Sequence, residues 1–455
     1  MPLPELIEIV PLTAPVKAEI TVPGSKSITN RALILAALAD GEVTLKGALW
    51  SEDTQIMVEC LKVLGFTVNV TEDPDETCNR TITVVGQGGL VPDGGTETQP
   101  LELFVGNAGT AARFLAPFLC LGSGVYRLSG VPRMHERPQA ALFAAICELG
   151  YRVEAEKAND KLPARIYGTG PRRGKCRVSI EESSQFASAL LLSAKVGGWE
   201  IQISGDNEDE SPYVAMTSKL IEAFPKKSGE FQIEPDASSG SYFWAAGWQM
   251  IAQNGNSDTG IQRFETDFVG RAKDQRNLLS LMLKYWPESD WQIDQRFPVV
   301  LSHSFSAEIS RNSHLGDSIM TAIVIAPLGK QPAKFTDLGR LRVQECERVV
   351  ALRTELTKCG AKVVEEGDTL TVWPSTLHGS EIETYNDHRM AMCFAVLGLK
   401  VPGIRIKNPA CVKKTFPNFF QKLAELPPKG LGAEIWEVKD GQRTRKLSGE
   451  DLFAD

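Results

Sequence analysis

Two helical patterns alternate along the 455-residue chain. In the first, apolar residues recur at i, i+3, i+4 and i+7, and segments rich in Val and Ile, which favour strands, flank the helix. This strand–helix–strand pattern occurs six times, and its fourth copy is weaker than the others. The copies occupy residues 42–70 (EVTLKGALWSEDTQIMVECLKVLGFTVNV), 125–156, 200–224, 261–286, 333–366 and 404–426.

The second pattern is Ala-rich and apolar nearly all round, which is typical of a helix buried inside a domain. It also occurs six times, between the copies of the first pattern. The sequence therefore predicts an α/β fold of six βαβ-type units, three in each of two domains. The six apolar helices are expected at residues 27–39 (SITNRALILAALA), 109–122, 183–197, 238–252, 316–329 and 387–399.

Polar residues stand at the expected N-termini of these six helices, with Lys or Arg beside several of them. A single Ser, Thr, Asn or Asp there is most simply an N-cap. If the helices run parallel within a domain, however, their positive ends lie together and favour phosphate or carboxylate. Two such faces that meet across a hinge would form a cleft for an anionic substrate. The residues concerned are Lys26 and Ser27, 107–110, 183–185, 236–239, Asp317 and Ser318, and 386–389.

The composition changes this picture little. It is that of a globular protein, with 42% hydrophobic and 23% charged residues, and the net charge of −8 argues against nucleic acid as a main partner. No apolar run is long enough to span a membrane, and the first residues lack the features of a signal peptide. Nine cysteines without a CxxC pair indicate reduced thiols, no metal site and a cytoplasmic protein.

Eight segments closely resemble, in order, the motifs of the 5-enolpyruvylshikimate-3-phosphate synthase family. The resemblance runs from about residue 15 to residue 425, and NDHRMAM and GNAGTA are its most specific parts. The P-loop spacing GxxxxGK[ST] is absent, which excludes a nucleotide-binding reading of the Gly-Ser-Lys run. The segments are GSKSITNRALILAALADG, GNAGTAAR, PRMHERPQ, SSQFASALL, PDASSGSYF, GDSIMTA, YNDHRMAMCF and KKTFPNFF.

The resemblance implies a transferase without cofactor or metal, which moves the enolpyruvyl group of phosphoenolpyruvate to the 5-hydroxyl of shikimate 3-phosphate through a tetrahedral ketal. It also implies two similar domains, each of three βαβαββ units around buried parallel helices (an inside-out α/β barrel), with the active site in the interdomain cleft. We expect the first domain to comprise residues 1–24 and 238–425, and the second 25–237. Residues 426–455 fall outside the resemblance and would form a hairpin, add strands or stay flexible. We expect a cytoplasmic monomer, and no nucleic-acid or membrane partner.

The family's site residues can be placed on this sequence motif by motif. The resemblance implies that Asp317 holds the reacting hydroxyl and that Glu345 gives and takes the proton at the methylene carbon. It implies that Gly109 sets the room beside phosphoenolpyruvate, which governs sensitivity to glyphosate. Lys26 would lie between the two substrates and join Asp317 and Glu345 in catalysis. The donor residues would be Lys26, Asn107, Gly109, Arg137, Gln185, Arg348, Arg389 and Lys414. The acceptor residues would be Lys26, Ser27, Arg31, Ser183, Ser184, Gln185, Tyr213, Asp317 and Gln344.

Simpler interpretations exist for most of these residues taken one at a time, and they involve only solvation, capping or local pairing. They are a solvated Lys26, N-caps at Asp236 and Asp317, a structural His388, and a Glu345 that is solvated on a helix face or pairs with Arg348.

Three departures from the family pattern fall on the acceptor side. Gln344 stands where the family has Lys, and Arg340, where some members have Asn, is a hypothetical source of the missing charge. Glu210 occupies a position that is often Ser, unless the loop shifts by one residue and Ser211 takes that place. In addition, residues 254–310 lack the family's Gln-Gly-Asp signature. The leading interpretation is the shikimate-pathway synthase itself. An enolpyruvyl transferase with a changed acceptor and a non-catalytic anion-binding paralogue are the alternatives, and a UDP-N-acetylglucosamine acceptor is less compatible with NDHRMAM and SSQF.

Overall fold

The computed structural model describes residues 3–157, 159–205, 211–251, 281–287, 289–303, 305 and 308–454. Glu210 and most of the weak fourth copy therefore lie outside the described residues, as does most of the segment expected to lack the Gln-Gly-Asp signature. The chain divides into two compact units. Unit 1 consists of Met1–Pro23 and Pro235–Asp455, and unit 2 of Gly24–Glu234.

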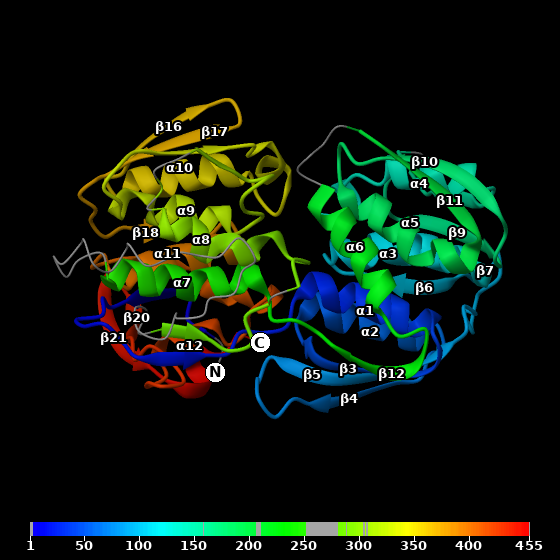
Figure 1. The fold of residues 1–455 in the computed structure, drawn as a ribbon, viewed down its shortest axis with the longest axis horizontal. Helices are drawn as coiled ribbons and strands as arrows, with labels where there is room; N and C mark the ends of the chain where they lie inside the picture. Colours follow the sequence, from blue (N-terminus) through cyan, green and yellow to red (C-terminus); the bar gives the residue numbers. More distant parts are fainter. Residues whose placement is uncertain are drawn as a thin grey trace. The chain divides into compact units, whose positions relative to one another are not determined.

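Unit 2 is built around three buried helices that pack against one another. Every residue of the second of these helices is buried, so it has no solvent-facing side. Figure 1 shows them surrounded by outer helices and sheets of the same unit. The core helices are α1 (Lys26–Leu38), α3 (Gly109–Cys120) and α5 (Ser184–Gly197), and the outer helices are α2 (Glu52–Val63), α4 (Ala140–Glu148) and α6 (Ser211–Ala223).

Three sheets cover the core helices of unit 2 in its described residues. The first has the strand order β12 (Lys227–Gln232), β3 (Asp40–Leu49), β5 (Asn79–Gln87), β4 (Val68–Glu72). The second has the order β6 (Leu101–Phe104), β7 (Ser123–Ser129), β9 (Ala164–Thr169), β8 (Arg152–Ala155). The third pairs β10 (Gly174–Ser179) with β11 (Trp199–Ser204) in parallel. Because buried and less buried positions alternate along β9, one face of its sheet is packed on the core.

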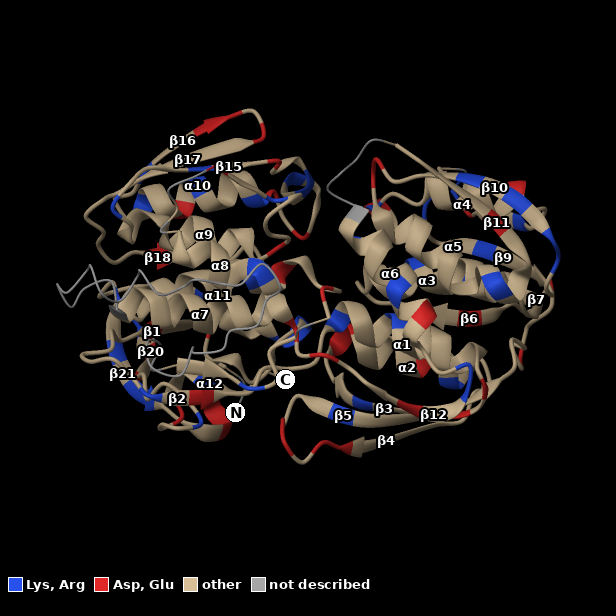
Figure 2. Ribbon diagram, in the orientation of Figure 1, with Lys and Arg blue, Asp and Glu red and all other residues tan. Residues whose placement is uncertain are grey.

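Unit 1 repeats this design around three mutually packed helices. Two of them carry no charged residue, and Figure 2 shows their ribbons almost entirely without charge colours. The core helices are α7 (Ala237–Ile251), α9 (Ile319–Ile325) and α11 (His388–Gly398), and the outer helices are α8 (Phe297–Ser302), α10 (Arg348–Lys358) and α12 (Phe419–Ala424).

The sheets of unit 1 also number three in its described residues. One pairs β13 (Leu281–Leu283) with β2 (Ala18–Ile20), and another has the order β14 (Glu308–Ser310), β15 (Ala333–Thr336), β17 (Thr369–Trp373), β16 (Lys362–Glu366). The third has the order β18 (Glu381–Ile382), β19 (Arg405–Lys407), β1 (Leu6–Ile9), β20 (Ile435–Lys439), β21 (Gln442–Leu447).

The predicted repeat is clearest in two segments with the same element order, β6-α3-β7-α4-β8-β9 in unit 2 and β14-α9-β15-α10-β16-β17 in unit 1. In each, the first two strands pair in parallel, and the last strand pairs antiparallel with both its predecessor and the second strand. A buried helix makes the crossover between the parallel strands, as such a connection requires. The six apolar helices are all present, but α9 is shorter than predicted. It continues as the 3₁₀ turn η4 (Ala326–Leu328), because Pro327 has no N–H to extend an α-helix.

The C-terminal segment forms a hairpin that adds its two strands to a sheet, so two of the three alternatives for it, the hairpin and the strand addition, are confirmed together. Strand β20 pairs antiparallel with β1, and β21 pairs with β20. The sheet thus combines the first strand of the chain with the last two. In the sheet of β14 to β17, by contrast, the last two strands in the order are β17 and β16, which pair with each other and follow β15 in the sequence.

A buried carboxylate joins these distant parts of unit 1. Glu8 of β1 is only 4% exposed, and it accepts hydrogen bonds from Arg405 Nε at 2.9 Å and Arg443 Nη2 at 2.6 Å. Burial alone would raise the pKa of Glu8, but the hydrogen bonds and charges of Arg443 and Arg405 outweigh it and lower the pKa. The ionised form is therefore the one that the fold stabilises.

Replacing this carboxylate tests how the tail is attached. We expect Glu8→Gln to lower the free energy of unfolding by about 1–3 kcal/mol at pH 7, because the three hydrogen bonds that it accepts from Arg405 and Arg443 are weakened. Since the folded-state pKa is lowered, the stabilisation is present above the unfolded pKa and is lost as the pH falls through the folded pKa. The difference in unfolding free energy between wild type and variant, measured by urea unfolding, should therefore become smaller below about pH 4. Glu434→Gln, which removes the exposed partner of Lys446, is the matched control. An equal loss in both variants would contradict the prediction.

Candidate active site

The core helices of unit 2 have no acidic residue as N-cap or in the first turn. Ser25, Ala108 and Ser183 are the N-caps of α1, α3 and α5, and no Asp or Glu lies in the first turn of these helices. The helices themselves therefore leave their positive ends uncompensated, and such ends attract anions. Two of these ends lie close together, because Arg113 Nη1 of α3 donates to Gln185 Oε1 of α5 at 2.8 Å.

Arg31 places a second positive charge in this region. Its side chain is 2% exposed and donates to Thr217 Oγ1 at 2.7 Å, Ser188 Oγ at 3.2 Å and the carbonyl of Ser27 at 2.9 Å. Within the described chain these hydrogen-bond partners are all neutral. Burial lowers the pKa of Arg31 to about 10, a shift that the nearby Tyr213 opposes. A buried cation held by neutral groups suits an anionic ligand.

Lys26, the first residue of α1, forms an ion pair with Asp53 at 3.1 Å. Asp53 lies in the first turn of α2, and its side chain is only 5% exposed. The interpretation of Lys26 as a solvated surface lysine is therefore wrong. The pair fixes the ammonium at the start of α1, beside Ser27.

Gly109 and Arg137 are in unusually close contact at the start of α3. A Cβ atom on Gly109 would lie 2.6 Å from both terminal nitrogens of Arg137. The guanidinium also donates through Nη1 to the carbonyl of Asn107 at 3.3 Å. Glycine leaves the room that this guanidinium occupies, and it is not needed for its backbone conformation, which is not left-handed. Any larger residue would displace the arginine.

The core helices of unit 1 begin differently, because carboxylates accept hydrogen bonds from their first amides. Asp236 accepts from the amide of Ser239 at 2.6 Å, and Asp387 accepts from the amide of Arg389 at 2.8 Å. The N-cap interpretation of Asp236 is thus confirmed. These acids neutralise the positive helix ends, so the anion attraction of unit 1 has to come from its arginines and lysines.

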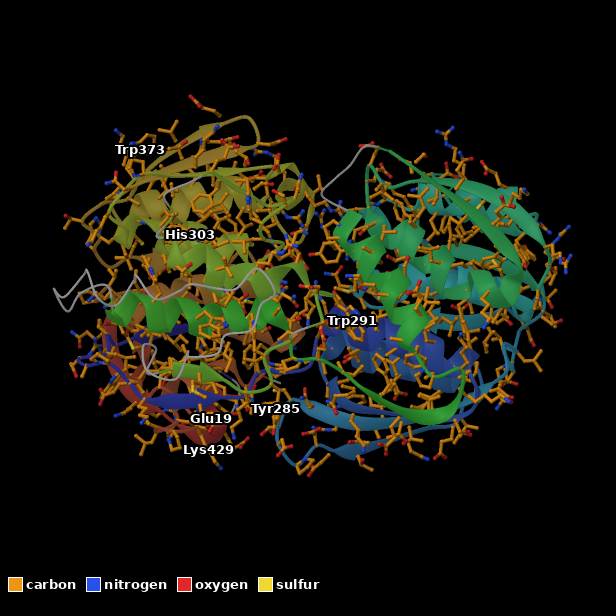
Figure 3. All side chains as sticks on the ribbon, viewed as in Figure 1. Glu19, Tyr285, Trp291, His303, Trp373 and Lys429 are labelled. Carbon is orange, nitrogen blue, oxygen red and sulfur yellow. The ribbon has the colours of Figure 1, made fainter. Side chains whose placement is uncertain are left out.

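Asp294 accepts hydrogen bonds at the start of α9, the remaining core helix of unit 1, although it lies at least 22 residues earlier in the chain. It lies in the 3₁₀ turn η3 (Ile293–Arg296), directly after the segment marked by Trp291 in Figure 3. Its Oδ1 accepts from the amides of Gly316 at 2.8 Å and Ser318 at 3.0 Å, and its Oδ2 accepts from the hydroxyl of Ser238. The starts of α7 and α9 are thereby tied together. The same bonds fix the backbone on both sides of residue 317.

Asp317 lies between two guanidinium groups. Arg311 Nη2 is 3.0 Å from its Oδ1, and Arg389 Nη2 is 3.2 Å from its Oδ2. Burial would raise the pKa of Asp317, but the charges of Arg389 and Arg311, with a smaller contribution from Arg348, hold it well below its usual range. Ser318 is the N-cap of α9, so the N-cap interpretation of Asp317 is wrong.

Glu345 is held between two cations near the start of α10. Its Oε2 is 2.8 Å from Arg348 Nη2, and its Oε1 is 2.9 Å from Lys414 Nζ. Arg348 is completely buried, forms a 2.7 Å ion pair with Asp387, and donates from Nη1 to Gln344 Oε1. The predicted pairing of Arg348 with Glu345 is confirmed. Glu345 precedes the helix and is not a solvated residue on its face.

The predicted site residues thus form two half-sites, each within one unit. Arg113 and Asp387 lie within the quoted motifs, but the sequence analysis assigned neither of them a role in the site. Asp53, Asp294 and Arg311 lie outside the motifs, and no spacing signalled them because they reach the site only through tertiary structure. His388 is 2% exposed, which fits its structural interpretation. Unit 2 carries Lys26, Ser27, Arg31, Asn107, Gly109, Arg137, Ser183, Ser184, Gln185 and Tyr213, and unit 1 carries Asp317, Gln344, Glu345, Arg348, Arg389 and Lys414.

Comparison with known proteins shows which family the chain belongs to. Residues 10–423 match the family model described as EPSP synthase (3-phosphoshikimate 1-carboxyvinyltransferase). The chain belongs to this family. A 3-phosphoshikimate 1-carboxyvinyltransferase of Opitutus terrae is 37% identical to it, over 95% of this chain and 100% of the relative. A 3-phosphoshikimate 1-carboxyvinyltransferase of Trichormus variabilis is 35% identical to it, over 93% of this chain and 99% of the relative. The chain is accordingly a transferase.

Solved structures confirm the predicted α/β fold class. EPSP synthase from Acinetobacter baumannii superposes with a TM-score of 0.66 at 19% identity, and 94% of this chain and 99% of that one are covered. The enolpyruvyl transferase NikO from Streptomyces tendae gives a TM-score of 0.63 at 15% identity, with 96% of this chain and 99% of that one covered. In the described part of the chain, no helix is both long and apolar enough to cross a bilayer, and no group of three or more His, Cys, Asp or Glu residues is placed to bind a metal ion.

The role of Asp294 can be tested directly. We expect Asp294→Ala to lower the free energy of unfolding by more than about 2 kcal/mol, because the amides of Gly316 and Ser318 and the hydroxyls of Ser238 and Ser318 lose their acceptor. Hydrogen exchange at Gly316 and Ser318 should accelerate more than exchange in unit 2. Glu308→Ala, which removes an exposed partner of Lys334, is the control. Unchanged exchange at residues 316 and 318 would contradict the prediction.

Proposed function

We propose that the chain transfers the enolpyruvyl group of phosphoenolpyruvate to the 5-hydroxyl of shikimate 3-phosphate and releases phosphate. The observation that carries this proposal is the clamp of Arg348 and Lys414 on Glu345, in a chain that matches named 3-phosphoshikimate 1-carboxyvinyltransferases over nearly their whole length. We further propose that the protein acts as a cytoplasmic monomer and needs both half-sites for one turnover.

The charges of the two half-sites suit two substrates that each bear a phosphate and a carboxylate. The acid-free helix ends of unit 2 favour phosphoryl groups, so we assign the phosphate and ring of the acceptor to Ser183, Ser184, Gln185 and Tyr213, with Ser27 and Arg31. Cations with planar, bidentate geometry favour carboxylate and phosphate oxygens. We assign phosphoenolpyruvate to Lys26, Asn107, Gly109, Arg137 and Gln185 of unit 2, and to Arg348, Arg389 and Lys414 of unit 1.

The partners of Arg348 bear on its assignment to the donor. Its guanidinium already contacts Asp387, Glu345 and Gln344. Binding of a substrate anion would therefore replace one partner, and the neutral Gln344 would cost least to replace, since no ion pair is lost. Gln344 would then turn to a ring hydroxyl of the acceptor, as its assignment to the acceptor requires. Arg340 remains our proposed source of the charge that a lysine at 344 would supply.

The reaction is an addition followed by an elimination. In the addition, the acceptor oxygen bonds to C2 of phosphoenolpyruvate while Glu345 gives a proton to C3, which produces the tetrahedral ketal. In the elimination, Glu345 takes a proton back from C3 as the bond between C2 and the phosphate oxygen breaks. Lys26 stabilises the charge on the leaving phosphate. Glu345 starts protonated, and the proton that it gives to C3 in the addition returns to it in the elimination, so the glutamate is regenerated.

Asp317 has a different part in this mechanism. Because its pKa lies well below the usual range, the carboxylate is a weak base and stays ionised at any pH of interest. It is therefore suited to accept a hydrogen bond from the attacking hydroxyl and to orient the oxygen lone pair toward C2. As the C–O bond forms, the proton of that hydroxyl passes to an oxygen of the phosphate group of phosphoenolpyruvate, and it leaves the site with the released phosphate.

Phosphate release tests the proposed function. We expect release only when phosphoenolpyruvate and shikimate 3-phosphate are both present. Glu345→Gln should lower kcat by about 10²–10⁴-fold, the usual contribution of a positioned proton donor. Glu347→Gln, which changes the N-cap of α10 two residues away, should keep kcat near that of wild type. Release from phosphoenolpyruvate alone would contradict the proposal, and release with a different acceptor would identify a changed acceptor.

The contact between Gly109 and Arg137 gives a second test. Gly109→Ala has to displace the guanidinium, so we expect the KM for phosphoenolpyruvate to rise by about tenfold or more, as loss of a charged hydrogen bond predicts. The KM for shikimate 3-phosphate should change much less. Gly130→Ala is no suitable control, because its Cβ would meet the backbone of Gly106, so we choose Ala111→Gly in the same turn. Equal changes in both KM values would count against the assignment of Gly109 and Arg137 to the donor.

A further inference from the structure

Arg311 is a buried cation that no sequence motif included. It follows β14, and its amide donates to the carbonyl of Thr336 in β15 at 3.1 Å. Its side chain is only 2% exposed and reaches Asp317 Oδ1 at 3.0 Å through Nη2. Burying a guanidinium is costly unless a carboxylate compensates it, so this contact calls for an explanation beyond chance packing.

The contact completes a symmetrical hold on Asp317. Arg389 approaches Oδ2 at 3.2 Å from α11, while Arg311 approaches Oδ1 from the other side of the carboxylate. One guanidinium on each oxygen fixes the rotation of the carboxylate plane. Each carboxylate oxygen can accept two hydrogen bonds, so both oxygens retain acceptor capacity for a hydroxyl. Asp294 fixes the neighbouring backbone, so the side chain and the main chain are both held.

We propose that Arg311 is a positioning residue for the acceptor hydroxyl: by holding Oδ1 of Asp317, it aims the carboxylate that orients the attacking oxygen. This inference rests on the proposed function, because it takes Asp317 to contact the acceptor. Arg311 itself contacts no reacting atom. Its effect passes through Asp317, so it should influence the acceptor and leave the donor unaffected.

The charges around Asp317 predict how removal of Arg311 would act. Arg389 of α11, Arg348 of α10 and Arg311 are the cations that lower its pKa. Two further acids face one of these cations, since Asp236 and Asp294 interact with Arg389. Without Arg311 the pKa of Asp317 rises toward its ordinary value. Protonation at low pH would then turn an acceptor into a donor, and the hydroxyl would lose its partner.

The test compares Arg311→Gln and Arg311→Lys with Arg296→Gln. Arg296 is the matched control, because its exposed side chain donates to the carbonyl of Ser313 in the same loop. We expect Arg311→Gln to raise the KM for shikimate 3-phosphate by about tenfold or more, as loss of one charged hydrogen bond predicts. The acid limb of kcat/KM should move to higher pH, and the KM for phosphoenolpyruvate should stay unchanged.

The lysine variant separates charge from geometry. Arg311→Lys keeps the positive charge but lacks the planar fork, so its acid limb should stay near that of wild type while the acceptor KM is intermediate. A purely structural role would change stability and would move neither the acid limb nor the ratio of the two KM values.

Each outcome decides the proposal. A folded Arg311→Gln variant with the acceptor KM and pH profile of Arg296→Gln overturns it. If Arg311→Gln fails to fold, the acceptor KM of Arg311→Lys decides, since an unchanged value overturns the proposal and a selective rise supports it. Absence of phosphate release by the wild-type chain would instead overturn the proposed function, so the two failures are distinguishable.

Discussion

The first amides of a buried helix need partners, and this constraint shapes the whole structure. Six core helices bring their N-termini toward functional side chains, three in each unit. Unit 2 leaves these ends without acidic side chains at α1, α3 and α5, so they keep their attraction for anions. Unit 1 places Asp236, Asp294 and Asp387 on the corresponding ends. The two units share one architecture and differ in the charge at its functional end.

This difference explains why the arginines of unit 1 are so firmly held. Carboxylates at the helix ends would repel a substrate anion unless cations lay close to it. Arg348 and Arg389 supply such charges, and each is fixed by an acid that belongs to another element. The same ion pairs place Glu345 and Asp317 in distinct environments, one clamped by Lys414 and Arg348, the other by Arg389 and Arg311. Two carboxylates can therefore take different parts in one reaction, as their surroundings decide.

The sequence predicted the elements better than the contacts. The alternation of two helical patterns located all six core helices, because burial on every side leaves a strong apolar signal. The length of α9 was missed because the apolar pattern continues through Pro327, which cannot extend the helix. The roles of Asp294 and Arg311 could not be predicted, because both residues lie outside the motifs. Asp294 is also distant in sequence from Ser238, whose hydroxyl it binds. The tail remained open among three alternatives because its pairing partner, β1, is at the opposite end of the chain.

The central claim is that the acid-free helix ends of unit 2 hold the phosphoryl group of the acceptor. The most direct measurement is a crystal structure of the full chain with shikimate 3-phosphate bound. The account predicts that the phosphoryl oxygens accept hydrogen bonds at the start of α5, from Ser183, Ser184 and Gln185. A phosphoryl group bound instead to Arg348 and Arg389 of unit 1 would contradict it.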